Sequence, residues 1–461
     1  MVNSSVKQRK TKTIIYWMVI LFIGIVFFFC VGQSGAILEK DSGVFLEDWS
    51  ILTSYGYIIY PKLLYVFRMI FGESNYLEMV FVFQSLFALC TSIIITEYLR
   101  KRCSLSCISS VIVFILSFGP YSYTLPQYVS SHCVITEGIA FPLFNIWMLF
   151  AIKYLSEKKM RYYAVVLLIT IAMLFTRSQL MLFVIIDVLI LGENIFRYCC
   201  SRINRKINKN AMVAMMTIVA IWVSVVGLLF FVKNNIYPQL TDAVSGRVLC
   251  IAEERDYMLF QGMDIELYEA LLDKTDELKS NKKYFRTNMK RWEDIVNGTN
   301  NNTKMIPDVI REYYPNDEIG EIKGRITFPL LREHIGEYVK MTAILFVQSI
   351  VVSVFYHPEW AYTLGFTVGV LLFVGAAILW LYAKKRVNNS SISLISLGLT
   401  LGVILLICTI TNLIFVGLQR YVVYPFGWFY ISCFLVIREM YSLLKCHPSN
   451  DIYHQNRAYV E

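Results

Sequence analysis

The stretch AYTLGFTVGVLLFVGAAILWL, Ala361 to Leu381, carries no charged side chain over a length that matches a lipid bilayer. A helix needs roughly 20 mostly apolar residues to cross the hydrocarbon core, because every backbone N–H and C=O must be bonded within the segment once water is absent. A second stretch of this kind, Ile392 to Leu413, follows after a short basic turn. These two runs predict an all-α polytopic membrane protein.

The composition of the whole chain agrees with this fold class. Of its 461 residues, 56% are hydrophobic and 17% charged, and the mean hydropathy is +0.53. One soluble core could not bury so much apolar side chain. Further apolar runs bring the expected number of membrane helices to about ten or eleven: Ile14–Val31, Leu77–Tyr98, Cys107–Phe118, Val134–Ile152, Tyr163–Phe175, Leu180–Leu191, Ala211–Val232, Met341–Phe355 and Tyr424–Val436.

The first run, Ile14–Val31, follows a basic segment with Lys7, Arg9, Lys10 and Lys12. A cleaved signal peptide is the alternative, but the run has the length of a full span and no small-residue cleavage site follows it. The positive-inside rule therefore predicts a cytoplasmic N-terminus. The net charge of +9 lies mostly in short loops. It indicates contact with anionic lipid and gives no argument for nucleic acid as a partner.

Charge and hydropathy divide the chain into successive parts. Residues 1–232 form an N-terminal transmembrane module, whose first outer loop, 33–75, is long enough for short interfacial helices. Residues 233–340 are hydrophilic and predict one large extracytoplasmic loop, which is expected to shape acceptor choice unless it is a loosely packed spacer. Residues 341–445 form the C-terminal membrane helices, and 446–461 form a polar tail. Within the large loop, Asn297 to Thr303 is interpreted as polar low-complexity sequence.

The run Met341–Phe355 decides between two topologies. If it crosses the membrane, the count is eleven and the basic turn with Lys384, Lys385 and Arg386 lies outside, against the positive-inside rule. If it is interfacial or re-entrant, the count is ten and this turn lies inside with the others. The ten-crossing arrangement is preferred.

Several enzyme classes lack their usual signatures in this sequence. It contains no CxxC pair, HExxH, P-loop or GxGxxG, the motifs expected of a zinc site, a nucleotide-driven pump or a dinucleotide enzyme. The eleven cysteines are scattered, and many lie in apolar runs, where a thiol acts as a small hydrophobe. The cysteines therefore predict no disulfide framework.

A few ionisable residues are predicted at the outer face of the membrane: Asp41, Asp48, Glu137, Arg177 and Arg420. Each alone has a simple structural explanation, such as a loop turn, a helix-dipole contact or an interfacial side chain. Acids and bases at this depth are costly unless they face a cavity or a partner. Because the preferred topology puts all of them on one side, they predict an outward-facing site at the lipid boundary.

Short motifs around these residues stand in a definite order. They are DSGVFLEDW from Asp41, SYGYIIYPKLLYVF from Ser54, VITEGIAFPLFNIWML from Val134, LLITIAMLFTRSQLMLF from Leu167, LLREHIGEYVK from Leu330 and LQRYVVYPF from Leu418. In this order, and over most of its length, the chain resembles the GT-C superfamily of polytopic membrane glycosyltransferases. The resemblance implies a cell-membrane enzyme that takes a sugar from a polyprenyl phosphate donor. Such an enzyme would pass the sugar to a glycan or lipid acceptor outside the cytoplasm.

The resemblance also implies roles for particular residues. Asp41 is expected to take the proton of the acceptor hydroxyl, with Asp48 as the alternative base. Arg420 and Arg177 are expected to bind the leaving lipid phosphate, with Glu137 orienting one of them or helping to hold a divalent metal. The remaining residues expected to bind substrate are Lys62, Tyr421 and His334.

Two departures from the family pattern stand in the sequence. Ser42 follows Asp41 where a second acid is expected, which weakens the case for a metal at Asp41. Ile335 follows His334 where the family has proline, which puts substrate contact at His334 in question.

Other classes of function stay open. An O-antigen-type polymerase or ligase would use the same kind of donor, but its arginines lie in two large outer loops, and this chain has one. A lipid-linked saccharide flippase or transporter would show two repeated halves, which are not evident here. A receptor or structural membrane protein would give no reason for an acid-plus-arginine set on one face.

Overall fold

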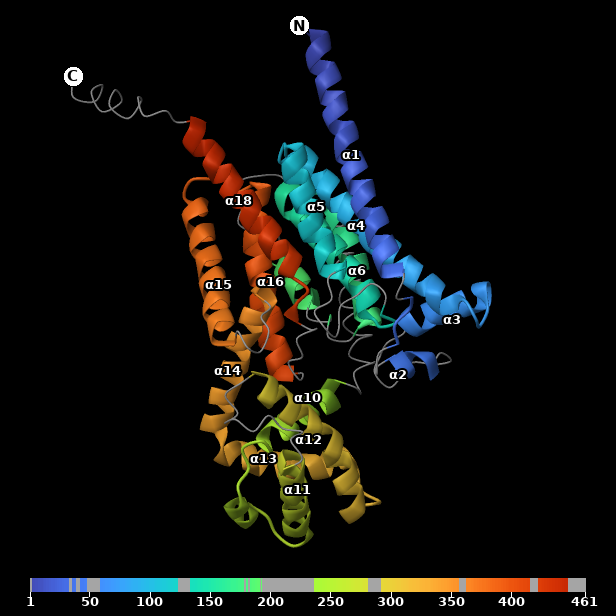
Figure 1. Ribbon diagram of the computed structural model, residues 1–461. Coiled ribbons are helices and arrows are strands. Elements are labelled where there is room, and N and C mark those ends of the chain that lie inside the picture. The colour runs from blue at the N-terminus through green and yellow to red at the C-terminus, as the bar shows by residue number, and fades with distance from the viewer. Residues whose placement is uncertain are drawn as a thin grey trace, which may run out of the picture.

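The computed structural model describes residues 2–32, 35–38, 42–47, 59–122, 133–177, 180, 183–190, 192, 236–280, 292–355, 362–414 and 422–446. These residues form an almost entirely helical protein whose only β-type pairing is an isolated bridge between Ile37 and Cys133. Long helices lie side by side in a bundle, and shorter helices form a second unit below it (Figure 1).

The bundle contains the helices that suit a membrane. They are α1 (Val2–Gly32), α4 (Tyr76–Arg102), α5 (Cys107–Ser122), α6 (Glu137–Glu157), α7 (Met160–Thr176), α14 (Ile335–Val354), α15 (Tyr362–Lys384), α16 (Ile392–Ile414) and α18 (Phe426–Cys446). Among the described residues, five helices are long and apolar enough to cross a bilayer: α4, α6, α14, α15 and α16. Shorter apolar stretches lie in α1, α5 and α7. The predicted helical membrane protein is thus confirmed at this level.

Contacts of α18 place two basic turns at one end of the bundle. Arg438 donates hydrogen bonds to the carbonyls of Cys103 (2.7 Å) and Ser104 (2.8 Å), in the turn between α4 and α5. The next residue, Glu439, accepts a hydrogen bond from Ser391 (2.7 Å), in the turn between α15 and α16. The two turns therefore lie beside each other, at the end of the bundle called here the basic end.

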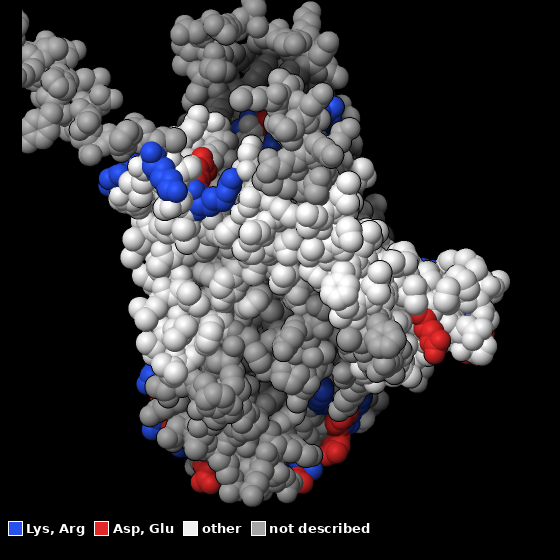
Figure 2. All heavy atoms as spheres, turned by 45° about the horizontal axis from the view of Figure 1, so that its top comes forward, with Lys and Arg blue, Asp and Glu red and all other residues white. Residues whose placement is uncertain are grey.

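The third basic turn, between α6 and α7, joins the same end through an ion pair between Arg102 and Glu157. Figure 2 turns this end toward the viewer and shows Lys and Arg side chains on it. Lys384, Lys385 and Arg386 thus share an end with the other two basic turns of the described residues, as the ten-crossing arrangement requires.

The run Met341–Phe355, on which the topology depends, corresponds to the later part of α14. This helix enters the bundle from the end opposite to the basic end. Ser349 accepts a hydrogen bond from Asn412 near the end of α16 (2.9 Å), and the carbonyl of Val354 accepts one from Tyr430 early in α18 (2.6 Å). Both partners lie at the end away from the basic turns. α15 then runs from there to the basic end.

The second unit consists of α10 (Ile236–Val248), the 3₁₀ helix η4 (Glu254–Leu259), α11 (Met263–Ser280), α12 (Trp292–Tyr313) and α13 (Ile319–Glu333). It has its own apolar core, which includes Val248, Leu267, Leu271, Ile310, Ile326 and Leu330. Residues 233–340 therefore contain a packed helical unit, and the alternative of a loose spacer is wrong for its described part.

The polar stretch Asn297–Thr303, interpreted as low-complexity sequence from its composition, lies inside α12. Asn302 is fully buried and donates a hydrogen bond to the Gly246 carbonyl on α10 (2.9 Å). The Thr303 hydroxyl lies within hydrogen-bonding distance of the carbonyls of Asp242 (3.1 Å) and Thr299 (2.8 Å), and its one proton can go to either. The side chains of Asn302 and Thr303 thus join α12 to α10, and the composition of the stretch gives no sign of these contacts.

The described part of the loop 33–75 contains the short helices α2 (Ser42–Glu47) and α3 (Ile59–Phe71). α3 buries Tyr60 and Leu64 and leaves Met69 and Ile70 exposed. It projects sideways near the level where the bundle meets the second unit (Figure 1).

Candidate functional site

A buried pair of opposite charges lies at the end of the bundle opposite to the basic turns. Glu137 is the first residue of α6, and Arg177 follows directly after α7. Because the two helices form a hairpin that turns at the basic end, their other ends meet. The two side chains form an ion pair, and each is only 3% exposed.

Thr136 completes this pair as a third polar group. Its hydroxyl accepts a hydrogen bond from Nη1 of Arg177 (3.2 Å) and donates one to Oε2 of Glu137 (3.0 Å). Buried charges lose hydration, and a pair is tolerated when the partners and further hydrogen bonds replace the lost water. Glu137 and Thr136 therefore both bond to the Arg177 guanidinium and to each other, which fixes the direction of the guanidinium.

Polar groups from α3 and α4 lie beside the start of α6. Gln84 donates a hydrogen bond to the hydroxyl of Tyr60 (2.9 Å), and both side chains are fully buried. A Cβ atom on Gly138 would lie 2.4 Å from the amide carbon and oxygen of Gln84, so the absence of a side chain lets these helices meet. The ring of Tyr60 packs edge-on against Phe45 of α2, with centroids 5.4 Å apart.

Hydrogen bonds join the loop 33–75 to the residues that precede Glu137. The Ser42 hydroxyl donates to the Val134 carbonyl (2.9 Å), and the Val134 amide donates to the Ile37 carbonyl (2.9 Å). Asp41 and Asp48, the predicted bases, lie outside the described residues. The adjoining Ser42 brings its part of the loop to the chain that leads into α6.

The segment after the predicted phosphate-binding arginine also reaches α6. Arg420 and Tyr421 lie outside the described residues. The ring of Tyr424 stacks on Phe141 with centroids 4.2 Å apart and contacts Phe144 at 5.9 Å. These phenylalanines follow Glu137 by about one and two helical turns. Four separate parts of the chain thus converge on the first turns of α6.

The other two predicted substrate-binding residues lie elsewhere. Lys62 is exposed on α3. His334 lies at the junction of α13 and α14, where its Nε2 is 2.7 Å from Oδ2 of Asp256, and both side chains are buried. The structure therefore gives His334 a partner within the second unit.

Asp256 is the centre of a small network around that histidine. It accepts a hydrogen bond from the Glu253 amide (2.8 Å). Tyr268 donates to the Glu253 carbonyl (2.6 Å), and burial raises the pKa of this phenol above its ordinary value, so it remains a donor. These contacts give His334 a structural role in the packing of the second unit.

The buried polar residues that sequence reasoning missed include Asp187 and Arg247. Asp187, in the helical segment 183–190, is fully buried and bonded to Trp147 (3.2 Å) and Thr170 (2.5 Å). Arg247 of α10 is 1% exposed and donates to the Asn412 carbonyl (2.6 Å). An acid inside an apolar run is a signal that could have identified Asp187. Arg247 stands in hydrophilic sequence and gives no such signal.

Within the described part of the chain, no group of three or more His, Cys, Asp or Glu side chains is placed to share a metal ion. Tyr60, Gln84, Thr136, Glu137 and Arg177 thus bring polar groups together at the start of α6, and a guanidinium is a group that recognises anions. Comparisons with protein-family models, curated proteins and solved structures found no match for this chain.

Proposed function

We propose that this protein is a membrane glycosyltransferase that moves a sugar from a polyprenyl phosphate donor to a glycan or lipid acceptor outside the cytoplasm. The observation that carries the proposal is the buried pair of Glu137 and Arg177, beside the loop that contains Asp41. The order of motifs that resembles the GT-C superfamily supports it, since this pair joins two of those motifs.

Arg177 would bind the phosphate of the donor. A guanidinium recognises phosphate and carboxylate oxygens through the same paired N–H donors, and these bonds strengthen as charge develops on the leaving group. Glu137 and Thr136 fix the direction of the guanidinium. Arg420 would supply a second cation from the segment that reaches α6 through Tyr424, and a divalent metal could share this task.

Asp41 would act as the general base. Its carboxylate takes the proton of the acceptor hydroxyl as that oxygen attacks the anomeric carbon. The bond between the anomeric carbon and the phosphate oxygen breaks, and its electron pair leaves with the lipid phosphate. The configuration at the anomeric carbon is inverted. Asp48 is the alternative base on the same loop.

The test is sugar transfer by the purified full-length protein from a panel of labelled polyprenyl phosphate sugars to a cell-envelope extract. Asp41→Asn is expected to lower turnover by about 10²–10⁴-fold with donor binding retained. Arg177→Lys keeps the charge but loses the paired donors, so donor binding and turnover should both fall. Arg255→Gln, at an arginine with a side chain 71% exposed, is the matched control.

The outcomes separate the alternatives. Full activity of Asp41→Asn would transfer the role of base to Asp48. Full activity of Arg177→Lys would remove the phosphate-binding role of Arg177. Absence of transfer from every donor in the wild-type protein would contradict the transferase and favour the polymerase, ligase or carrier.

A further inference from the structure

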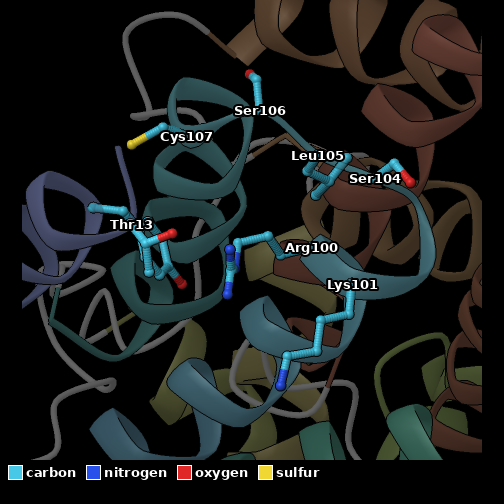
Figure 3. A pocket seen from close by; sticks show the side chains of 8 residues that line it. Thr13, Arg100, Lys101, Ser104, Leu105, Ser106 and Cys107 are labelled. Atoms are coloured by element: carbon cyan, nitrogen blue, oxygen red, sulfur yellow. The ribbon is translucent and has the colours of Figure 1, made fainter. Parts of the chain in front are cut away.

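A cavity of about 590 Å³ opens at the basic end, between α1 and the turn that joins α4 to α5. Its lining consists of Thr13, Tyr16, Arg100, Lys101, Ser104, Leu105, Ser106 and Cys107. Figure 3 shows the side chain of Arg100 directed across the cavity toward Thr13 of α1. The lining contains two cations, three aliphatic hydroxyl groups and no acidic residue. The hydroxyl of Ser106 already accepts a hydrogen bond from the Ser109 amide (3.2 Å) at the start of α5.

The two cations are available to different degrees. Arg100 donates two hydrogen bonds to Glu97, from Nε and Nη2 at 2.9 Å each, which leaves the other N–H groups of its five-donor fork for a ligand. Its guanidinium also lies 5.1 Å from the centroid of the Tyr16 ring, which fixes its position. Lys101 is 72% exposed, and its nearest carboxylate oxygen, on Glu97, is 3.9 Å away. The lysine can therefore reach an anion at the mouth of the cavity.

Two helix ends border this cavity. At the C-terminus of α4, the carbonyls of Leu99 and Arg100 are occupied by the Cys103 amide (2.8 Å) and the Leu105 amide (3.0 Å). α5, a helix of 16 residues, starts at Cys107 on the cavity wall. A helix N-terminus carries a partial positive charge. The cavity therefore combines side-chain cations with a favourable helix end.

The surroundings of the cavity are apolar and exposed. On α1, Ile14, Met18, Leu21 and Ile25 are 59%, 64%, 58% and 66% exposed, at the spacing of one helix face. On α5, Ile108, Ile112 and Ile115 are 75%, 38% and 50% exposed, again along one face. Both rows begin next to lining residues, Thr13 and Cys107. A ligand that fits this place carries an anionic head and long apolar chains.

We propose that this cavity binds the phosphate headgroup of an anionic membrane lipid, with the acyl chains lying along the exposed rows of α1 and α5. Basic pockets between membrane helices at the headgroup level bind such lipids. The site is independent of the transferase proposal, because it lies at the opposite end of the bundle from Glu137 and Arg177. Free phosphate shares the headgroup chemistry but would make no use of the apolar rows.

The experiment is native mass spectrometry of the full-length protein released from phosphatidylcholine nanodiscs that contain some phosphatidylglycerol. The wild-type protein should retain phosphatidylglycerol in preference to phosphatidylcholine. Lys101→Gln should lower this occupancy about fivefold, since one basic residue near the surface contributes about that factor. Lys101→Glu should lower it further. Both changes fall on an exposed side chain, so the fold should be retained.

Lys385→Gln and Lys385→Glu are the matched controls, because Lys385 is an exposed lysine at the same end but outside the cavity. An equal loss of bound phosphatidylglycerol in these controls would show that general surface charge causes the effect, and it would overturn the site. Displacement of the lipid by inorganic phosphate at comparable concentration would assign the cavity to free phosphate and overturn the lipid. Equal retention of the two lipids by the wild-type protein would also overturn the proposal.

Discussion

At the scale of single residues, Glu137 and Arg177 illustrate the energetics of charges withdrawn from water. Their desolvation is offset by their mutual attraction and by the Thr136 hydroxyl. When one partner is removed, the other stays buried without its compensation. Sequence motifs identified both residues individually, but they are separated along the chain by α6 and α7, and only the hairpin packing brings them together.

Glu137→Leu or Arg177→Leu alone should therefore destabilise the protein by about 3–5 kcal/mol, while the double replacement should cost much less than the sum. The measurement is a double-mutant cycle by denaturant unfolding in detergent. The exposed pair of Lys274 and Glu277 serves as the control, with side chains 51% and 55% exposed. Its coupling should not exceed about 0.5 kcal/mol. Additive effects at Glu137 and Arg177 would contradict the ion pair.

Asp187 is an acid that lies among neutral partners. Thr170 lies 2.5 Å from its Oδ2 and 3.0 Å from the Val166 carbonyl, but one hydroxyl has only one proton to donate. Both bonds form when the carboxyl is protonated and donates to Thr170, while Trp147 donates to Oδ1. Such a group joins α6, α7 and the segment 183–190 without any buried charge.

Asparagine can reproduce these bonds, since its amide donates where the acid does and its oxygen accepts from Trp147. Asp187→Asn should thus change the free energy of unfolding by less than about 0.5 kcal/mol. Asp187→Ala should cost about 1–3 kcal/mol, because it leaves buried polar groups without partners. Unfolding midpoints of the two variants decide the matter, and equal damage from both would indicate a charged carboxylate.

At the scale of elements, hydropathy predicted where the membrane helices lie but did not predict the residues at which they end. The run Val134–Ile152 corresponds to α6, which continues to Glu157, and the run Leu77–Tyr98 corresponds to α4, which continues to Arg102. Charged side chains are costly to bury in lipid, but Lys, Arg and Glu have high helix propensity. A helix can therefore continue past the end of its apolar run. The helices of the second unit were harder to predict, because Asn302 and Thr303 stabilise α12 through partners distant in the sequence.

The crossing of α10 and α12 depends on Gly246. A Cβ atom there would lie 2.4 Å from the Thr303 hydroxyl oxygen and 2.5 Å from the Thr299 carbonyl oxygen. Alanine normally favours a helix over glycine by about 0.8–1.0 kcal/mol. Here the clash should dominate, and Gly246→Ala should destabilise this unit by about 1–3 kcal/mol.

Hydrogen–deuterium exchange of the α10 and α12 peptides in the full-length protein measures this local stability. Gly324→Ala on α13 is the control, because its nearest neighbour is a side-chain atom of Phe328 at 3.5 Å. That variant should be neutral or more protected. Unchanged exchange in Gly246→Ala would mean that the two helices separate at little cost.

At the scale of the whole molecule, Arg247 joins the second unit to the bundle. It donates to the Asn412 carbonyl on α16 (2.6 Å) and to Thr342 on α14 (3.3 Å). Its guanidinium lies 5.5 Å from the centroid of the Tyr338 ring. Arg247→Leu should therefore increase exchange in α10 and in the first turns of α14, where Arg255→Leu, at a side chain 71% exposed, should not. Equal protection in both variants would exclude this connection.

The position of the basic turns at one end of the bundle leads to a prediction for the orientation of the molecule in the membrane. The sequence could not decide the topology, since Met341–Phe355 is apolar enough to cross; the contacts of Arg438 and Glu439 show which turns share an end. The positive-inside rule then predicts that this end faces the cytoplasm and that the second unit and the Glu137–Arg177 pair face outward.

Single cysteines test this orientation in intact cells with a thiol reagent that does not cross membranes. Glu277→Cys, on α11, should be labelled, because its side chain is 55% exposed on the unit that is predicted to face outward. Lys385→Cys should be labelled only after the cells are permeabilised, and the unaltered protein corrects for its native cysteines. The opposite pattern would place Glu137 and Arg177 on the cytoplasmic side. Sugar transfer to an acceptor outside the cytoplasm would then be impossible at this site, whatever donor the protein binds.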